Sequence, residues 1–401
     1  MASTNMESND FIAVKRLIES ATHATRKAER TLYKTMSPTL RKDLGMDELR
    51  GAVENCLRII DEQQDKHPSA YLPGACGEVA LPEPTPVMVD SQGALTEMLV
   101  SMAGALDTPN AAADLSVDVE RYCLSRHGTI SLVQIFVHAT NVVYLVHVAV
   151  LGAAAFSTPV AAASGIFKGM PLTLKTVLES SAVTKLFWDC RNDSDALYHL
   201  YGVKLAGVID VQLWDLATRE KRKERATVKT LSHAFTQRMR RDISEADINA
   251  WSLVKDAGRR AHEANEYDEV EREYIKAGGK LPEATTSKRQ DSVGSQDSNS
   301  DNESPSKGKD AFAQSPLRPL MQAYAVNDVR VLPVMLEHFT VKHRFWNTEW
   351  QVRVCTASED RVEEGISPNS TLRMWRGVGR TRLRMGGGMW RRSTDSRLRE
   401  G

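Results

Sequence analysis

Residues 115–120 read LSVDVE, and this stretch carries the strongest signal for fold and chemistry in the 401-residue chain. Apolar and polar residues alternate along it, as expected for a β-strand with one buried face. Asp118 and Glu120 therefore share the other face. Two carboxylates on one face of an apolar strand repel each other and resist desolvation. A bound cation removes both problems, so the pair predicts a cation site.

The sequence around this strand predicts an α/β fold. Residues 129–137 and 142–148 predict two more strands, and their short connections favour antiparallel hairpins. Three antiparallel strands followed by strand–helix–strand units indicate a ribonuclease H-like mixed sheet flanked by helices. Pro333 is expected to kink or end the last predicted helix. The other predicted elements are short strands at 87–89, 185–188 and 208–211, and helices at 95–106, 172–180, 193–201, 214–275 and 320–338.

Shifts in composition divide the chain. Ser, Asp, Asn, Lys and Gly dominate residues 285–310, which have almost no apolar side chain to offset the cost of ordering. We interpret this stretch as a disordered insertion. The full division is a helical N-terminal extension at 1–65, a Pro- and Gly-rich linker at 66–85, the α/β domain at 86–345, and a disordered Arg- and Gly-rich tail at 346–401.

The overall composition is typical of a soluble intracellular protein. Apolar residues make up 41% and charged residues 26%. The five cysteines show no CxxC spacing, which argues against a zinc site and a disulfide framework and suits a reducing compartment. No secretory signal is visible, and the longest apolar run, residues 142–156, is too short to span a bilayer. We therefore expect no membrane association and a location in the nucleus or cytoplasm.

Three segments far apart in the sequence carry a set of acidic residues. They read VDVE at 117–120, DCRNDSDALY at 189–198 and PLRPLMQAYAVNDVR at 316–330. Their order and local context closely resemble the 3′–5′ exonuclease domain family of the DEDDy class, which includes ribonuclease D, the Werner helicase exonuclease domain and Egalitarian. The resemblance covers roughly residues 86–345. An isolated DxE has no value as a motif, whereas DxE, NDxDAL and YxxxD in this order form a strong combination.

The resemblance implies five catalytic residues and two Mg²⁺ or Mn²⁺ ions. Asp118 and Glu120 match the first motif, Asp193 the second, and Tyr324 and Asp328 the third. Asp118 would bridge the metals, Glu120 and Asp328 would complete the shell of the first, and Asp193 would support the second. Hard divalent ions prefer carboxylate oxygens, and such a pair can clamp the attacking and leaving oxygens of a phosphodiester. Tyr324 would orient the attacking water, because a phenol with a pKa of about 10 is a poor general base.

Each assignment has a simpler alternative when it is taken alone. Asp195 competes with Asp193, which is favoured because the family's aspartate precedes by four residues the apolar position filled here by Leu197. Asp193 could instead cap a helix, Tyr324 could be a packing residue and Asp328 could be a solvated helix charge. The joint order of the motifs favours the metal site. The helical spacing of Tyr324 and Asp328, four residues apart, places both on one face.

The resemblance implies a metal-dependent exonuclease acting on the 3′ end of RNA or single-stranded DNA. The alternative is an RNA-binding adaptor that has lost catalysis, against which the retained acidic set argues. Basic residues in segment 219–241 could contact phosphates, but interleaved glutamates suit an ordinary solvated face slightly better. Arginines and tryptophans in the tail could hold single strands. Arg126 and His127 fit a substrate contact or a plain turn equally well, and the N-terminal helices are a candidate docking segment for a protein partner.

Overall fold

The computed structural model describes residues 79–106, 114–120, 126–161, 167, 169–219, 224–225, 227–264, 267–282, 310–341 and 348–367. The predicted N-terminal extension, most of the predicted linker, almost all of the predicted insertion and residues 368–401 of the predicted tail lie outside these residues.

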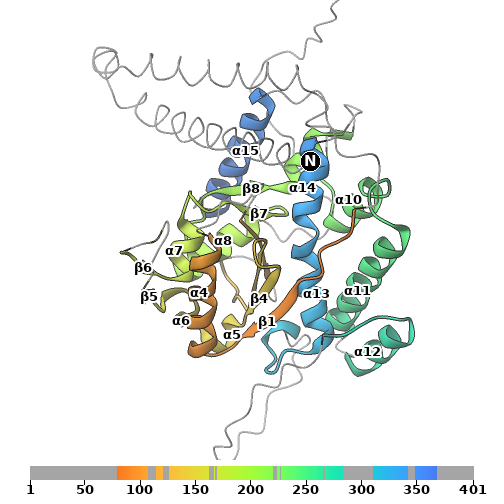
Figure 1. Ribbon diagram of the computed structural model, residues 1–401, viewed down its shortest axis with the longest axis horizontal. Helices are drawn as coiled ribbons and strands as arrows, with labels where there is room; N and C mark the ends of the chain where they lie inside the picture. Colours follow the sequence, from red (N-terminus) through yellow and green to blue (C-terminus); the bar gives the residue numbers. More distant parts are fainter. Residues whose placement is uncertain are drawn as a thin grey trace, which may run out of the picture.

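A six-stranded mixed sheet forms the centre of the protein, in the order β1-β4-β3-β2-β7-β8 (Figure 1). β2 pairs antiparallel with β3, and β3 with β4, whereas the β1–β4, β2–β7 and β7–β8 pairs are parallel. This arrangement confirms the predicted mixed sheet. A separate two-stranded sheet joins β5 (Val160–Ala161) to β6 (Pro171–Leu172). The central strands are β1 (Thr85–Val89), β2 (Leu115–Glu120), β3 (Leu132–Val137), β4 (Val142–Val146), β7 (Lys185–Phe187) and β8 (Val208–Asp210).

One face of the sheet packs on the first group of helices. Leu115, Val117 and Val119 of β2 are buried there with the apolar stripe of α4, as the alternation in LSVDVE predicts. Leu197 of α8 joins the same cluster. The helices of this group are α4 (Gln92–Leu106), α5 (Val148–Leu151), α6 (Ala154–Ser157), α7 (Leu174–Glu179) and α8 (Arg191–Tyr201).

The other face, which carries Asp118 and Glu120, lies under α13 (Pro319–Arg330). Leu132 and Phe136 of β3 pack there against apolar residues of α13. α11 (Glu245–Ala264) packs on α13 and on α12 (Tyr267–Lys276) (Figure 1). A short 3₁₀ helix, η4 (Ala311–Ala313), leads into this layer. The third motif thus lies directly above the first.

The predicted break at Pro333 is confirmed. α13 ends at Arg330, and α14 (Leu332–Val341) begins beyond Val331. Proline has no backbone N–H to donate to the preceding turn, so it is tolerated near the start of a helix and not in its interior. α14 packs on α9 (Val211–Ala217), and α10 (Leu231–Arg238) packs on α11.

The prediction that residues 346–401 form a disordered tail is wrong over residues 348–366. These residues form α15 (Thr348–Ile366), which packs on α8 and β8. Its buried face includes Val354 and Val362, but also Ser358 and Arg361. The face has helical spacing, yet half of it is polar, so its apolar pattern is too weak to distinguish it from a solvated segment. The domain therefore extends at least to residue 366.

Among the described helices, none combines the length and apolar character that a membrane span requires.

Candidate active site

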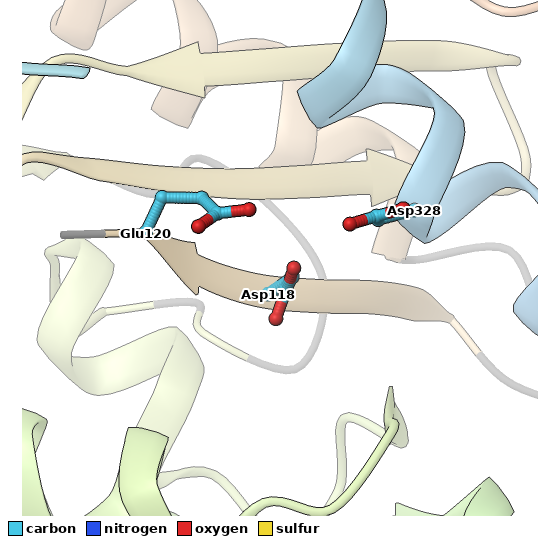
Figure 2. Close-up of side chains that lie close together, drawn as sticks. All are labelled: Asp118, Glu120 and Asp328. Atoms are coloured by element: carbon cyan, nitrogen blue, oxygen red, sulfur yellow. The ribbon is translucent and has the colours of Figure 1, made fainter. Parts of the chain in front are cut away.

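Three of the predicted site residues converge above β2. Asp118, Glu120 and Asp328 each offer a carboxylate oxygen, and these oxygens lie within 4.8 Å of one another (Figure 2). The first two come from β2, and Asp328 comes from α13, which crosses that face of the sheet. Asp118 and Glu120 are half-buried and Asp328 is buried, so the group is open to solution on the strand side. Packing of α13 on the sheet is what brings the first and third motifs together.

The three carboxyl groups repel one another when they are ionised, and burial adds to the cost of ionising them. Burial, and then the Asp328 charge, raises the pKa of Asp118 to about 7. Burial followed by the charges of Asp118 and Asp328 raises the pKa of Glu120 well above its ordinary value. Burial also raises the pKa of Asp328, although the nearby Lys255 ammonium opposes this. Burial and mutual repulsion therefore disfavour the ionised carboxyl groups when no divalent cation balances them.

Asp193 of α8 lies near Asp118. It is the third residue of α8, is 4% exposed, and is not one of the three residues whose oxygens meet. Burial and then the Asp118 charge raise its pKa well above the ordinary value, which reflects how near the two groups are. Its Oδ1 atom is buried and has no hydrogen-bond partner among the described residues. An unpaired buried carboxylate oxygen needs a cation or a water.

Asp195, the competitor of Asp193, has a structural role. It accepts hydrogen bonds from the Arg126 backbone N–H at 2.7 Å and from Arg126 Nε at 2.9 Å. Arg126 Nη2 in turn donates to the carbonyls of Gly365 and Ser367, which follow or end α15. Asp195 and Arg126 thus tie the turn after β2 to α8 and α15. These contacts favour the plain turn role for Arg126 and leave Asp193 as the predicted second-motif residue.

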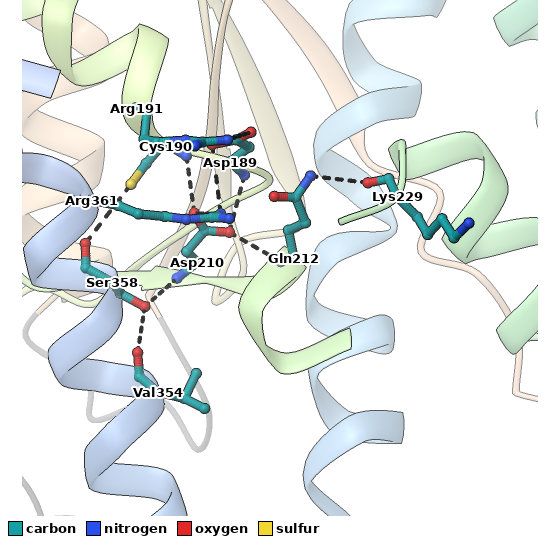
Figure 3. A network of polar contacts seen from close by, with 9 residues as sticks. All are labelled: Asp189, Cys190, Arg191, Asp210, Gln212, Lys229, Val354, Ser358 and Arg361. Carbon is teal, nitrogen blue, oxygen red and sulfur yellow. Dashed lines mark hydrogen bonds and ion pairs between the residues drawn. The ribbon is translucent and has the colours of Figure 1, made fainter. Parts of the chain in front are cut away.

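A buried polar network fixes the turn that leads into α8 (Figure 3). The Asp210 carboxylate accepts hydrogen bonds from the backbone N–H groups of Asp189 at 3.0 Å and Cys190 at 3.2 Å. Arg361 of α15 donates to the same carboxylate at 2.5 Å. Asp189 adopts a left-handed backbone conformation, with φ of 64°, and its side chain pairs with Arg191 at 2.6 Å. The network sets where α8 starts and therefore where Asp193 lies.

Tyr324 lies beside Asp328, as its spacing predicts, and both contact Lys255 of α11. Lys255 Nζ donates to the Tyr324 hydroxyl at 2.7 Å and also to Asp328 Oδ2. Burial, and then the Asp328 charge, raises the pKa of Tyr324 above its ordinary value. The phenol therefore stays protonated at neutral pH and can donate a hydrogen bond. A protonated phenol is what the predicted positioning role requires.

Sequence reasoning missed Lys255 and Gln134. Lys255 lies in the highly charged segment 214–275, where no local feature distinguishes it from solvated lysines and arginines. Gln134 of β3 is directly opposite Asp118 in the strand register, so their side chains point to the same face. It is fully buried, and neither amide atom has a hydrogen-bond partner among the described residues. One polar residue in the otherwise apolar strand LVQIFV could have indicated it.

Part of the basic segment 219–241 has an internal role. Arg219 is 4% exposed, pairs with Asp215, and donates to the carbonyls of Glu224 and Thr227. Arg238 donates to Thr218 and is half-buried. These two arginines hold the chain after α9, and Arg219 is buried away from solvent. Residues 221–223 lie outside the described part of the chain.

The match to a protein family defines the class of this domain. Residues 86–249 match the family model described as 3′-5′ exonuclease. This part of the chain is therefore similar to 3′–5′ exonuclease domains, and the resemblance inferred from the motifs is confirmed at that level. The matched range includes Asp118, Glu120 and Asp193 and ends before Tyr324 and Asp328, which the fold brings to the same place.

Individual relatives are similar over short stretches. The piRNA biogenesis protein EXD1 of Mus musculus is 35% identical over 103 residues, which are 25% of this chain and 15% of the relative. The human protein of the same name is 35% identical over 103 residues, which cover 17% of its length. The aligned part thus spans less than a fifth of these relatives. Among solved structures, Trypanosoma brucei RNase D is 20% identical, with a TM-score of 0.46 over 72% of this chain and 75% of that one.

Proposed function

We propose that this chain is a metal-dependent 3′–5′ exonuclease that hydrolyses phosphodiester bonds at the 3′ end of RNA or single-stranded DNA. The observation that carries the proposal is the convergence of Asp118, Glu120 and Asp328 from distant segments onto one partly buried patch. Asp193 lies near enough for the Asp118 charge to raise its pKa. The exonuclease domain identified over residues 86–249 supports the same class of reaction.

The residues present fit divalent metal ions. Each acidic group offers oxygen, which is the ligand that Mg²⁺ and Mn²⁺ prefer. Asp193 Oδ1 and Asp328 Oδ1 are buried without hydrogen-bond partners among the described residues, so each can accept a further bond. The raised pKa values of Asp118 and Glu120 come from burial and like charge, and a cation relieves both. We assign one ion to Asp118, Glu120 and Asp328, and a second to Asp118 with the support of Asp193.

The chemistry divides between the ions and the protein. When bound, two such ions neutralise charge on the phosphate and lower the pKa of a coordinated water. Tyr324 keeps its proton at neutral pH, because its pKa is raised by burial and by Asp328. It can therefore donate to the attacking water and hold a lone pair toward phosphorus. We assign to Glu120, which is half-buried, the role of helping to orient the same water. Orientation of this kind lowers the barrier by fixing the reacting atoms before attack.

We propose RNA as the substrate to test first. The curated relatives are described as piRNA biogenesis proteins, and their names refer to an RNA pathway. Because the aligned part covers a small share of those proteins, the proposal names RNA as the substrate class and does not name a specific RNA. An RNA-processing enzyme of this kind would act in the nucleus or the cytoplasm.

A direct test uses oligonucleotides with a 3′ overhang, one of RNA and one of DNA, with Mn²⁺ or with a chelator. Wild-type protein should produce a ladder that shortens from the 3′ end only with Mn²⁺. Asp118→Ala should produce none. Glu97→Ala removes an exposed carboxylate on α4, remote from the site, and should match the wild type. Metal-independent shortening, or shortening by Asp118→Ala, would refute the proposal.

An adaptor that binds RNA without cutting it is the second candidate. The contact between Lys255 and Asp328 favours it, because an ammonium group already satisfies one oxygen of the acidic set. Retarded but intact oligonucleotide with both wild type and Asp118→Ala would support this candidate and oppose the exonuclease.

A further inference from the structure

The Tyr324 side chain packs against one face of α11. Lys255 and Gly258, three residues apart on this helix, both face the tyrosine. Lys255 Nζ is 2.7 Å from the hydroxyl and 4.0 Å from the ring centroid. The lysine is thus close to the oxygen that would contact the attacking water. It comes from a segment that the three acidic motifs do not include.

Gly258 supplies the space for the ring. A Cβ atom at this position would lie 2.2 Å from Tyr324 Cδ2 and 2.8 Å from Tyr324 Cβ. No side chain fits there without moving the tyrosine. The ring therefore packs directly on the backbone of α11, while the lysine one turn away holds its hydroxyl. Two different interactions define one position for the phenol.

Lys255 also acts on the acidic set. It contacts Asp328 Oδ2, and its charge opposes the rise in the pKa of Asp118, Glu120 and Asp328. Asp328 Oδ1 keeps no hydrogen-bond partner among the described residues. Asp328 Oδ2 is therefore paired with the Lys255 ammonium, and Asp328 Oδ1 can still bind a metal ion.

We propose that Lys255 is a positioning residue of this site, with two opposed effects. It donates to the phenol oxygen of Tyr324, which leaves the phenol proton free to point at the attacking water. It also repels and competes with the metal ion at Asp328, so it weakens metal uptake. The inference rests on the proposed exonuclease function and adds to it a residue outside the family motifs.

The two effects predict opposite changes in one variant. Lys255→Met removes the charge and the donor at once. We expect it to bind Mn²⁺ about 10-fold more tightly, because a close like charge is removed. We expect its single-turnover rate at saturating Mn²⁺ to fall about 10- to 100-fold, the scale for losing a hydrogen bond from a charged donor. Partial unfolding would weaken binding and slow the reaction together, so a purely structural role cannot produce this split.

Two further variants separate the effects. Gly258→Ala displaces the Tyr324 ring without changing charge, so the rate should fall about 10-fold while Mn²⁺ affinity stays within about twofold. Lys255→Arg keeps the charge and should keep Mn²⁺ affinity near that of the wild type. The matched control is Arg259→Met, which removes an exposed cation of the same helix that pairs only with Asp256 and Glu263 in the described structure. It should change neither quantity.

The experiment measures Mn²⁺ binding by isothermal titration calorimetry and cleavage of a 3′-overhang RNA, on the full chain, with circular dichroism to verify folding. Tighter Mn²⁺ binding with slower cleavage in Lys255→Met supports the inference. A Lys255→Met protein that matches Arg259→Met in both, while the wild type binds Mn²⁺ and cleaves, overturns the inference and leaves the exonuclease proposal intact. A wild type that takes up no Mn²⁺ overturns both.

Discussion

Replacing Arg361 by methionine tests whether α15 is an integral part of the folded domain. Arg361 is 4% exposed, and its Nη1 atom is 2.5 Å from Asp210 Oδ2 and 3.5 Å from Asp189 Oδ1. Asp210 itself is fully buried. Methionine keeps most of the side-chain volume and removes the charge and the donors. The Asp210 carboxylate then stays buried without its cationic partner.

The expected cost follows from these contacts. Removing one partner of a buried ion pair typically costs about 3–5 kcal/mol, because the remaining charge is left uncompensated. Asp210 still accepts hydrogen bonds from the backbone N–H groups of Asp189, Cys190 and Gln212. These donors offset part of the loss, so we expect about 3 kcal/mol. Because the same turn leads into α8, Asp193 should shift and the cleavage rate should fall as well.

Urea unfolding followed by circular dichroism measures the change in the free energy of unfolding. The matched control is Lys204→Met, since Lys204 pairs with Glu363 of the same helix at 2.9 Å. That pair is more than half exposed, so its loss should cost at most about 1 kcal/mol. An Arg361→Met protein as stable as Lys204→Met would refute the reasoning, because it would mean that the contact between Arg361 and Asp210 adds little to the free energy of unfolding.

Three other results follow from the site and its packing. Asp118→Asn should abolish Mn²⁺-dependent cleavage and leave the metal-free melting temperature unchanged or higher, since it removes a repelled carboxylate; a large loss of folding would mean that the residue is structural. The folded-state pKa of Asp118, about 7, is above the unfolded value, so its contribution to stability is present at low pH and is lost as pH rises through about 7; melting in a chelator should show this decline, and a flat profile from pH 4 to 8 would contradict it. Gly365→Ala should destabilise by about 1–3 kcal/mol, because its Cβ would lie 2.5 Å from the Arg191 carbonyl oxygen, whereas Gly93→Ala meets nothing within 4 Å and should be neutral in the same urea titration.

Local patterns predicted the strands of the central sheet and most of the helices around it, although not α15. Alternation in LSVDVE correctly separates the core face of β2 from the face with Asp118 and Glu120. The four-residue spacing correctly places Tyr324 and Asp328 on one side of α13. These predictions succeed because side-chain direction in a strand or helix depends only on the local backbone repeat. The motif order added which distant segments should meet.

Other features depended on contacts between segments that no local pattern relates. α15 is held by Arg361 and Ser358, polar residues that a sequence reading assigns to the surface and that are buried because Asp210 lies opposite them. Lys255 becomes part of the site only because α11 packs on α13. A polar side chain can be buried when another segment supplies its partner, and the identity of that partner is set by the tertiary fold. The sequence by itself therefore determined the central strands, most of the helices and the acidic set, whereas the tertiary structure alone decided that residues 348–366 form a helix and which charged residues serve the interior and the site.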